Sequence, residues 1–353
     1  MHLKRVRMVD VAQAAGVSRT TASLVLNGRA KTIAAATRQR VLQAAQQMGY
    51  SRHATALALR TGRTRRIGIV LNEPEDFDEH DVYFSTVLAG ITKGALSQDY
   101  NLVLHSCHYM DWHELYSDIL SPTADGVLLV GRFIQDPLTP ALLDAGFPCV
   151  CISYQVSHPD CYSVDCDNIQ GGYLAAQHLF QLGHRQIAFL YPGETVRWGR
   201  DRLAGAQQAA VEAGLSPPSF HLYQWPDDGN MPSEASIHAA VRFLQTCRPR
   251  PTAMICCDEL RAQSITECLP SAGIRVPEDL AVVSFNSTEQ SARTRPPMTS
   301  VAQPLREIGF AAVEMLVDLI EGREVAKRCL RFPMSLDVRE SCGARTIPAH
   351  SVR

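Results

Sequence analysis

The chain has 353 residues and a mass of 38.9 kDa, which is enough for two or three domains. Hydrophobic residues make up 46% and charged residues 20% of it, so an ordinary packed core is available and wholesale disorder is excluded. No apolar run reaches the roughly 18 residues of a membrane span, and the first ten residues lack the apolar core of a secretory signal. Eleven cysteines without such a signal indicate reduced thiols. We therefore expect a cytoplasmic protein that is neither membrane-bound, fibrous nor exported.

The net charge of −2 conceals an asymmetry along the chain. Residues 1–66 contain thirteen Lys and Arg against a single acidic residue, Asp10, so this segment carries +12 and the remainder −14. A basic segment joined to an acidic body is typical of a polyanion-binding unit attached to a unit of another kind. A solvated basic face or a disordered basic arm is the alternative, which the helical periodicity of the segment disfavours.

The basic segment has the pattern of a helix-turn-helix. Apolar residues within 8–26 fall on two short amphipathic helices, and Gly16 between them can adopt the positive φ that ends the first. Ser18 is a natural N-cap for the second helix. A third helix over about 35–48, with Gly49 as its stop signal, would close a three-helix core. Its apolar stripe is Val41, Leu42, Ala45 and Met48.

A helix-turn-helix places its second helix in the major groove, with first-turn side chains aimed at base edges. Here those side chains are Arg19, Thr20 and Ser23, of which Arg19 can donate bidentately to guanine. An ordinary helical hairpin has the same pattern, but the surrounding positive charge favours DNA binding.

Residues 9–28, VDVAQAAGVSRTTASLVLNG, resemble the N-terminal signature of the LacI/GalR family of bacterial transcription regulators. Thr37-Arg38 and residues 48–51 also fit, and the resemblance continues to about residue 340. It implies that the helix-turn-helix reads half of an operator. It also implies that residues 51–60 form a hinge helix in the minor groove.

The same resemblance implies seven DNA-contacting positions. They are the base readers Arg19, Thr20 and Leu24, the backbone or supporting contacts Thr21, Ser23 and Asn27, and the wedge Leu59. An apolar wedge unstacks a base step and opens the minor groove for a pair of helices. A linker residue that merely packs on a neighbour is the alternative for Leu59.

Three departures from the family pattern affect the expected operator sequence. Arg7 and Ala34 stand where the family usually has Ser or Thr helix caps, each loss costing roughly 1 kcal/mol. Arg52-His53 replaces Pro-Asn before the hinge. Leu24 replaces a polar base reader, so we expect apolar contact there, for example with a thymine methyl.

From residue 67 onward, short β-rich runs alternate with helical stretches, which predicts parallel sheets with both faces covered. There are enough strands for two doubly wound lobes, with a ligand at the carboxyl ends of the strands. The predicted strands are 67–71, 102–104, 126–130, 149–152, 187–190, 253–256 and 280–283. The predicted helices are 83–98, 168–182, 201–213, 234–246 and 304–321.

Catalysis is not supported by any motif in this body. It has no GxGxxG after a strand, Walker A, GxSxG or HExxH motif. Two groups of His and Cys lack the spacing of a zinc site. A strand would send Cys149 and Cys151 to the same face, so we interpret both as buried small hydrophobes. The two groups are His105, Cys107 and His108, and Cys149, Cys151, Cys161 and Cys166.

The body resembles the family's effector-binding core, which is similar to periplasmic sugar-binding proteins. Arg202 aligns with an arginine that grips effector hydroxyls or carboxylates, and its five donors suit such a ligand. Asp258 stands where the family mostly has Asn, and Asn286 where it mostly has Asp, so the hydrogen-bonding pattern of the pocket has changed. Tyr154 and Phe84 align with pocket positions, and plain core is the alternative for each.

The sequence therefore predicts a DNA-binding domain (1–50), a hinge and linker (51–66), a two-lobed effector-binding and dimerisation core (67–342) and a tail (343–353). We expect a homodimeric repressor on pseudo-palindromic operator DNA, without a cofactor or a metal. A sugar or sugar derivative is the expected effector, with a nucleoside or purine second. The rival is a solute-binding or sugar-processing protein with an unrelated basic extension.

Overall fold

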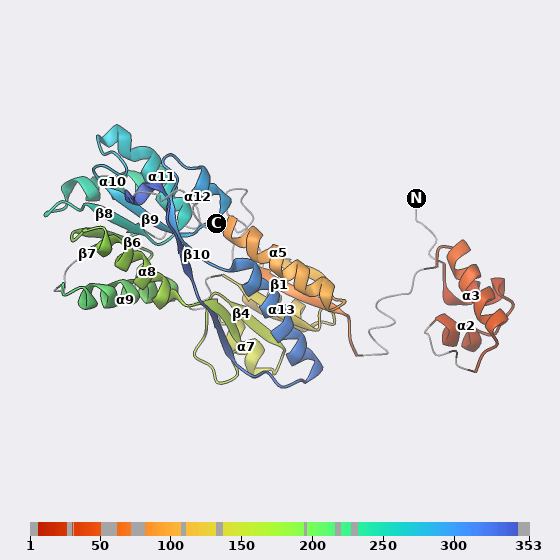
Figure 1. Ribbon diagram of the computed structural model, residues 1–353. Coiled ribbons are helices and arrows are strands. Elements are labelled where there is room, and N and C mark those ends of the chain that lie inside the picture. The colour runs from red at the N-terminus through yellow and green to blue at the C-terminus, as the bar shows by residue number, and fades with distance from the viewer. Residues whose placement is uncertain are drawn as a thin grey trace, which may run out of the picture. The chain divides into compact units, whose positions relative to one another are not determined.

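The computed structural model divides into two compact units, Met1–Thr64 and Arg65–Arg353 (Figure 1). This division falls inside the predicted linker. The predicted hinge at 51–60, with Leu59, lies outside the described residues, as does Asn27. The described residues are 6–26, 30, 32–50, 62–71, 82–106, 111–131, 137–193, 196–215, 220–226 and 232–344.

Within its described residues, the first unit comprises three short helices around a small apolar core, as the sequence predicted. Leu42 is an exception, because it is 49% exposed and Ala44 takes its expected place in the core. The helices are α1 (Met8–Ala14), α2 (Arg19–Leu26) and α3 (Ala35–Gln47). The buried residues are Val11, Ala12, Ala15, Ala22, Val25, Leu26, Ala30, Val41, Ala44 and Ala45.

Local hydrogen bonds explain where the first two helices begin and end. Gly16 has a φ of +64° and ends α1. The backbone N–H of Thr21 donates to Ser18 Oγ at 3.1 Å, which confirms Ser18 as the cap of α2. Arg7, which precedes α1, supplies no side-chain cap, but Asp10 accepts from its backbone N–H at 2.8 Å. Half of a capping box therefore compensates for the missing Ser or Thr.

The second unit contains two six-stranded sheets within the described residues. The first has the order β11-β5-β4-β3-β1-β2, and all of its paired strands are parallel. The second has the order β12-β10-β9-β8-β6-β7, and only β12 is antiparallel to its neighbour. The first sheet comprises β1 (Arg66–Leu71), β2 (Asn101–Ser106), β3 (Gly126–Val130), β4 (Cys149–Ile152), β5 (Ser163–Cys166) and β11 (Cys329–Phe332). The second comprises β6 (Ile187–Tyr191), β7 (Phe220–Gln224), β8 (Ala253–Cys256), β9 (Ala281–Asn286), β10 (Thr299–Ala302) and β12 (Ser335–Asp337).

Helices cover both faces of the first sheet. Residues of β4 alternate between the two faces, with Val150 and Ile152 in the core beneath α5 and α13 and Cys149 and Cys151 in the core beneath α6 and α7. The expected placement of the two cysteines on one buried face is thus confirmed. The bounds are α5 (Val82–Ser97), α6 (Trp112–Leu120), α7 (Leu138–Asp144) and α13 (Leu305–Glu321).

The second sheet is covered in the same way, with α8 and α9 on one face and α10 and α11 on the other (Figure 1). The chain passes between the sheets after β5, after β10 and between β11 and β12. The lobes are therefore interleaved in sequence. The helices are α8 (Asn168–Gln181), α9 (Arg197–Glu212), α10 (Glu234–Thr246), α11 (Glu259–Cys268) and α12 (Glu289–Arg293), with 3₁₀ turns η2 (Leu269–Ala272) and η3 (Glu340–Cys342).

Candidate functional site

The second helix of the first unit separates an apolar side from an exposed side. Arg19 and Thr20 are exposed, Leu24 is 37% exposed, and Ser23 is half-buried on the same side. Helical spacing places these four predicted DNA-contacting residues on one face, opposite the buried ones. The buried residues of α2 are Ala22, Val25 and Leu26.

Thr21 differs from these four residues because it supports the start of the helix. Its hydroxyl lies 2.9 Å from the hydroxyl of Ser18, whose Oγ also accepts the Thr21 backbone N–H. Arg19 is exposed, so its guanidinium is accessible to a ligand outside the unit.

In the second unit, Arg202 is a buried cation and only 5% exposed. Its Nε donates to Asn168 Oδ1 at 2.9 Å, and its Nη1 donates to the backbone oxygen of Cys257. Its guanidinium carbon lies 4.1 Å from the ring centre of Phe285 and 4.8 Å from that of Trp198. Burial lowers the pKa of Arg202 from its usual value, but an arginine stays protonated in proteins.

Asp165 supplies a carboxyl group close to this cation. It accepts the backbone N–H of Cys166 at 2.7 Å, and Asn168 Nδ2 lies 3.4 Å and 3.5 Å from its two oxygens. Burial raises the pKa of Asp165 to about 6, against the smaller opposing effects of the Cys166 N–H and Arg202. Asn168 therefore links the carboxyl group to the guanidinium.

Tyr83, near the start of α5, completes this group of side chains. Its hydroxyl is hydrogen-bonded to Ser153 Oγ, and burial raises its pKa above the usual value. The charges of Asp165 and Arg202 both act on it. Sequence analysis identified Phe84 instead, which is 3% exposed and packs in the core.

We call Tyr83, Asp165, Asn168, Trp198, Arg202 and Phe285 the effector cluster. Its members come from the carboxyl ends of β5 and β9, from the first turns of α5 and α8, and from the first two turns of α9. This is the edge of a parallel sheet at which α/β proteins bind ligands. Hydrogen-bond donors, acceptors and aromatic faces lie together there.

Asn286, predicted as an effector ligand, lies next to Phe285 at the end of β9 with a φ of +83°. Its Oδ1 accepts from Gln303 Nε2, and Cys166 Sγ donates to Gln303 Oε1 at 3.1 Å. This chain of hydrogen bonds joins the carboxyl ends of strands from both sheets. Asn286 is therefore part of the connection between the lobes.

Asp258 lies directly after the carbonyl that binds Arg202. It caps α11 by accepting the backbone N–H of Arg261 at 2.8 Å, and its other oxygen lies 3.2 Å from Arg261 Nη1. The side chain is thus near the effector cluster but already has partners.

The following residue, Glu259, is 5% exposed. It accepts the hydroxyls of Thr288 and Ser291 and the backbone N–H of Ser291. These bonds fix the loop after Asn286, a role that sequence analysis did not identify.

Tyr154, which the sequence also predicted as a pocket residue, lies outside the effector cluster. It is 5% exposed within the apolar cluster beneath α6 and α7, and its hydroxyl lies 2.9 Å from Thr139 Oγ1. The structure therefore places Tyr154 in the core, the alternative that the sequence left open, whereas the preceding Ser153 contacts Tyr83.

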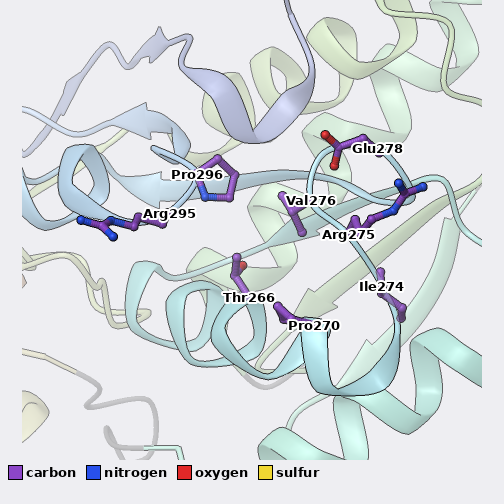
Figure 2. A pocket seen from close by; sticks show the side chains of 8 residues that line it. All are labelled: Thr266, Pro270, Ile274, Arg275, Val276, Glu278, Arg295 and Pro296. Carbon is purple, nitrogen blue, oxygen red and sulfur yellow. The ribbon is translucent and has the colours of Figure 1, made fainter.

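A cavity of about 280 Å³ lies away from the effector cluster, between α11, η2 and the segment before β10 (Figure 2). Arg295 lies at one end of it, and Arg275 and Glu278 lie at the other (Figure 2). Both Nε and Nη2 of Arg275 donate to Asp279, at 2.8 Å and 3.0 Å. The cavity shares no residue with the cluster.

No three His, Cys, Asp or Glu residues within the described ranges are arranged to hold a metal ion. His105 Nδ1 lies 2.8 Å from Asp118 Oδ2, whereas Cys107 and His108 lie outside the described residues. None of the described helices is both long enough and apolar enough to cross a membrane.

Known proteins match the chain in both units. Residues 7–53 match the family model for bacterial regulatory proteins of the lacI family, and residues 176–342 match a periplasmic binding protein-like domain. The HTH-type transcriptional repressor PurR of Vibrio cholerae serotype O1 (strain M66-2) is 31% identical over 341 residues, which cover 94% of this chain and 96% of the relative. PurR of Photobacterium profundum is 28% identical over 335 residues, covering 94% and 97%.

Solved structures are similar over nearly the whole chain. The transcriptional regulator CelR in its cellobiose complex is 30% identical, with a TM-score of 0.71 over 96% of this chain and 100% of that one. The lac repressor dimer bound to operator and the anti-inducer ONPF has a TM-score of 0.81 over 96% and 99%, and its 24% identity supports the fold alone. The expected fold is thereby confirmed. The chain belongs to the LacI family of bacterial regulatory proteins and is a DNA-binding transcriptional regulator, not an enzyme.

Proposed function

We propose that this chain is a cytoplasmic repressor that binds a pseudo-palindromic operator as a homodimer, and that a small molecule bound at the effector cluster sets its affinity for DNA. The observation that carries this proposal is the environment of Arg202. Within the described residues, its guanidinium has recorded partners at Nε and Nη1 only. The donors of Nη2 remain for oxygen atoms of a ligand.

A sugar or sugar derivative is the effector class that the cluster favours. Sugars have hydroxyls that both donate and accept, and the cluster offers Arg202 as a donor, Asp165 as an acceptor and Asn168 as both. The rings of Trp198 and Phe285 suit the apolar face of a sugar ring. The cellobiose complex of the similar regulator CelR supports the same class.

A purine is the second candidate, because several relatives of this chain are repressors named PurR. The aromatic side chains of the cluster also suit stacking on a purine ring.

The domain arrangement is part of the proposal, with DNA reading by residues 1–50, a hinge at 51–66, effector binding and dimerisation by 67–342, and a tail at 343–353.

The proposed mechanism is linkage between two binding events. A ligand held by residues from both lobes favours one arrangement of the lobes, and it changes operator affinity only as far as it binds the two arrangements differently. A two-fold symmetric operator needs two hinges and two DNA-binding domains, so the working unit is a dimer.

The test begins with selection of duplexes from a random pool by the full-length chain. A two-fold symmetric consensus supports the proposal, and enrichment of no sequence over competitor DNA contradicts it. A thermal-shift panel of sugars, sugar phosphates, nucleosides and purines then identifies the effector class. Deletion of residues 1–60 should abolish DNA binding and keep the ligand-dependent shift. A solute-binding protein with an unrelated extension would show no DNA preference before the deletion.

A further inference from the structure

Two cysteine thiols lie against each other beneath the first sheet. Cys151 Sγ and Cys161 Sγ are 3.9 Å apart, and both side chains are at most 3% exposed. Cys151 lies in β4, and its backbone N–H donates to the carbonyl of Tyr162 at 2.9 Å. Residues 153–162, which lead to β5, form neither helix nor strand. One thiol is thus on a fixed strand and the other is on an irregular segment.

The two thiols differ in their chemistry. The two sulfurs share a hydrogen bond, and this bond lowers the pKa of Cys161 to about 7, with further lowering from a hydrogen bond to the Val156 backbone and from the charge of His158. The same bond and burial raise the pKa of Cys151. Burial raises the pKa of the nearby Cys149 to about 12. Cys161 is therefore the more acidic of the two thiols, and the thiolate is the form that reacts with oxidants.

We propose that Cys151 and Cys161 are a hydroperoxide-sensitive dithiol that closes to an intrachain disulfide. The Cys161 thiolate attacks one oxygen of hydrogen peroxide, which breaks the O–O bond, forms a sulfenic acid and releases hydroxide. The Cys151 sulfur then attacks the sulfenic sulfur, and the thiol proton and the hydroxyl leave as water. The peroxide takes up the two electrons that the two thiols lose.

Closure requires movement of the irregular segment. A disulfide has an S–S distance of about 2.0 Å, so the sulfurs must approach each other by roughly 2 Å. Because β4 is paired with β3 and β5, the displacement falls on residues 153–162. The segment also reaches the surface from which peroxide arrives, since the side chain of His158, whose carbonyl accepts the Cys161 N–H, is 17% exposed.

The same segment contacts the surroundings of the effector cluster. Ser153 is hydrogen-bonded to Tyr83, and Gln155 Oε1 accepts from Arg197 Nη1 at 2.8 Å. Oxidation would therefore change effector affinity as well as the thiols. This consequence rests on the proposed function, whereas formation of the disulfide does not.

The experiment treats the full-length protein with hydrogen peroxide under native conditions, alkylates the remaining thiols and maps peptides by mass spectrometry. The expected product is a Cys151–Cys161 disulfide, formed at a rate at least about tenfold above oxidation of Cys149. A parallel circular dichroism spectrum establishes that the protein is still folded. Oxidation confined to the more exposed Cys247, Cys268 or Cys329, or equal oxidation of Cys149 and Cys161, would overturn the proposal.

Two variants separate the steps. In Cys151→Ser, Cys161 should accumulate as a sulfenic acid that dimedone traps, and in Cys161→Ser, Cys151 should remain reduced. Cys149→Ser is the matched control, and it should form the disulfide like the parent. Dimedone adducts on Cys151 in place of Cys161 would contradict the assigned order of attack.

A final comparison uses calorimetry to measure the affinity of the protein for the effector chosen from the thermal-shift panel, before and after oxidation. Unchanged affinity with the disulfide present would contradict the coupling to the effector cluster and leave the dithiol chemistry in place. Absence of any effector binding before oxidation would instead contradict the proposed function.

Discussion

Arg202 and Asn168 lie on two successive helices of the second lobe, α9 and α8, and their side chains are joined by a hydrogen bond of 2.9 Å from Nε to Oδ1. Asn168 uses its Nδ2 to approach the carboxylate of Asp165. The guanidinium is thereby held edge-on to an amide and face-on to Phe285. The donors of Nη2, for which no partner is recorded within the described residues, therefore have a fixed direction before any ligand arrives, which lowers the entropy cost of binding.

Replacement of Arg202 by Lys should weaken binding of the effector without weakening binding of operator DNA. A lysine keeps the charge but cannot donate in two directions from one plane. We expect effector affinity to fall by roughly tenfold to a hundredfold, with operator affinity unchanged in the absence of effector. Calorimetry with the panel-selected compound measures the first quantity, and fluorescence anisotropy with the selected duplex measures the second.

Arg200→Lys is the matched control, because Arg200 is an exposed arginine of the same helix. It should behave like the parent in both assays. Effector affinity that survives Arg202→Lys intact would remove Arg202 from the binding site.

Asp165 makes stability depend on pH. Burial raises its pKa from the usual 3.8 to about 6, so the folded state holds the proton more tightly than the unfolded state. The corresponding stability is fully present below about pH 4 and is lost as the pH rises through about 6. Between pH 5 and 7.5 this loss amounts to about 1 kcal/mol.

Asp165→Asn should remove this contribution, so its free energy of unfolding should change less between pH 5 and 7.5 than that of the parent. Urea denaturation at the two pH values measures the difference. Asp111→Asn, at an exposed position before α6, should keep the parental dependence. An identical pH dependence in Asp165→Asn and the parent would disprove the assignment.

The sequence predicted the regular elements well where the pattern was long or strongly apolar. All seven predicted strands are present, because buried parallel strands are continuous apolar runs. Five strands were not predicted. Of these, β7, β11 and β12 lie at sheet edges and are only half-buried or exposed. The other two, β5 and β10, lie inside the sheets, but each has only four residues and includes polar ones, so neither forms an apolar run. Their position depends on pairing with distant segments and is not marked by local periodicity.

The site was predictable only in part, for a related reason. The sequence singled out Arg202, but not Tyr83, Asn168 or Trp198. Each of these three is an ordinary first-turn residue of a helix, and only the interleaving of the two lobes brings them together. Asp165 had a signal, since a carboxylate directly before the end of a buried strand requires a polar partner.

Glu259 should be essential for the loop that follows Asn286. Glu259→Ala leaves the buried hydroxyl and N–H of Ser291 without their acceptor, and we expect a loss of about 2–4 kcal/mol in the free energy of unfolding. Glu259→Gln keeps one carbonyl acceptor and should cost less. Urea denaturation measures both, with the exposed Glu289→Ala as control. A loss in Glu259→Ala no larger than in the control would be inconsistent with this role.

The contact between α8 and α9 should not tolerate a methyl group. A Cβ at Gly205 would overlap the carbonyl oxygen of Ile169, so Gly205→Ala must push apart the helices that carry Asn168 and Arg202. We expect a loss of more than about 2 kcal/mol. Gly214→Ala meets no atom within 4 Å and only has to adopt a φ of +70°, which should cost about 1 kcal/mol. Equal losses in the two variants would show that the close approach does not limit packing.

DNA binding by the first unit should depend steeply on salt, since residues 1–66 carry +12 and neutralisation of phosphates releases counterions. Arg19→Ala removes an exposed guanidinium from the recognition face of α2, and it should lower affinity for the selected duplex by about tenfold to a hundredfold. Because a base contact distinguishes sequences, random duplex should be bound almost as well as by the parent. Arg40→Ala, an exposed arginine of α3, should leave that preference unchanged. Anisotropy titrations from roughly 50 to 200 mM salt measure both effects, and equal losses on selected and random DNA would reduce Arg19 to a phosphate contact.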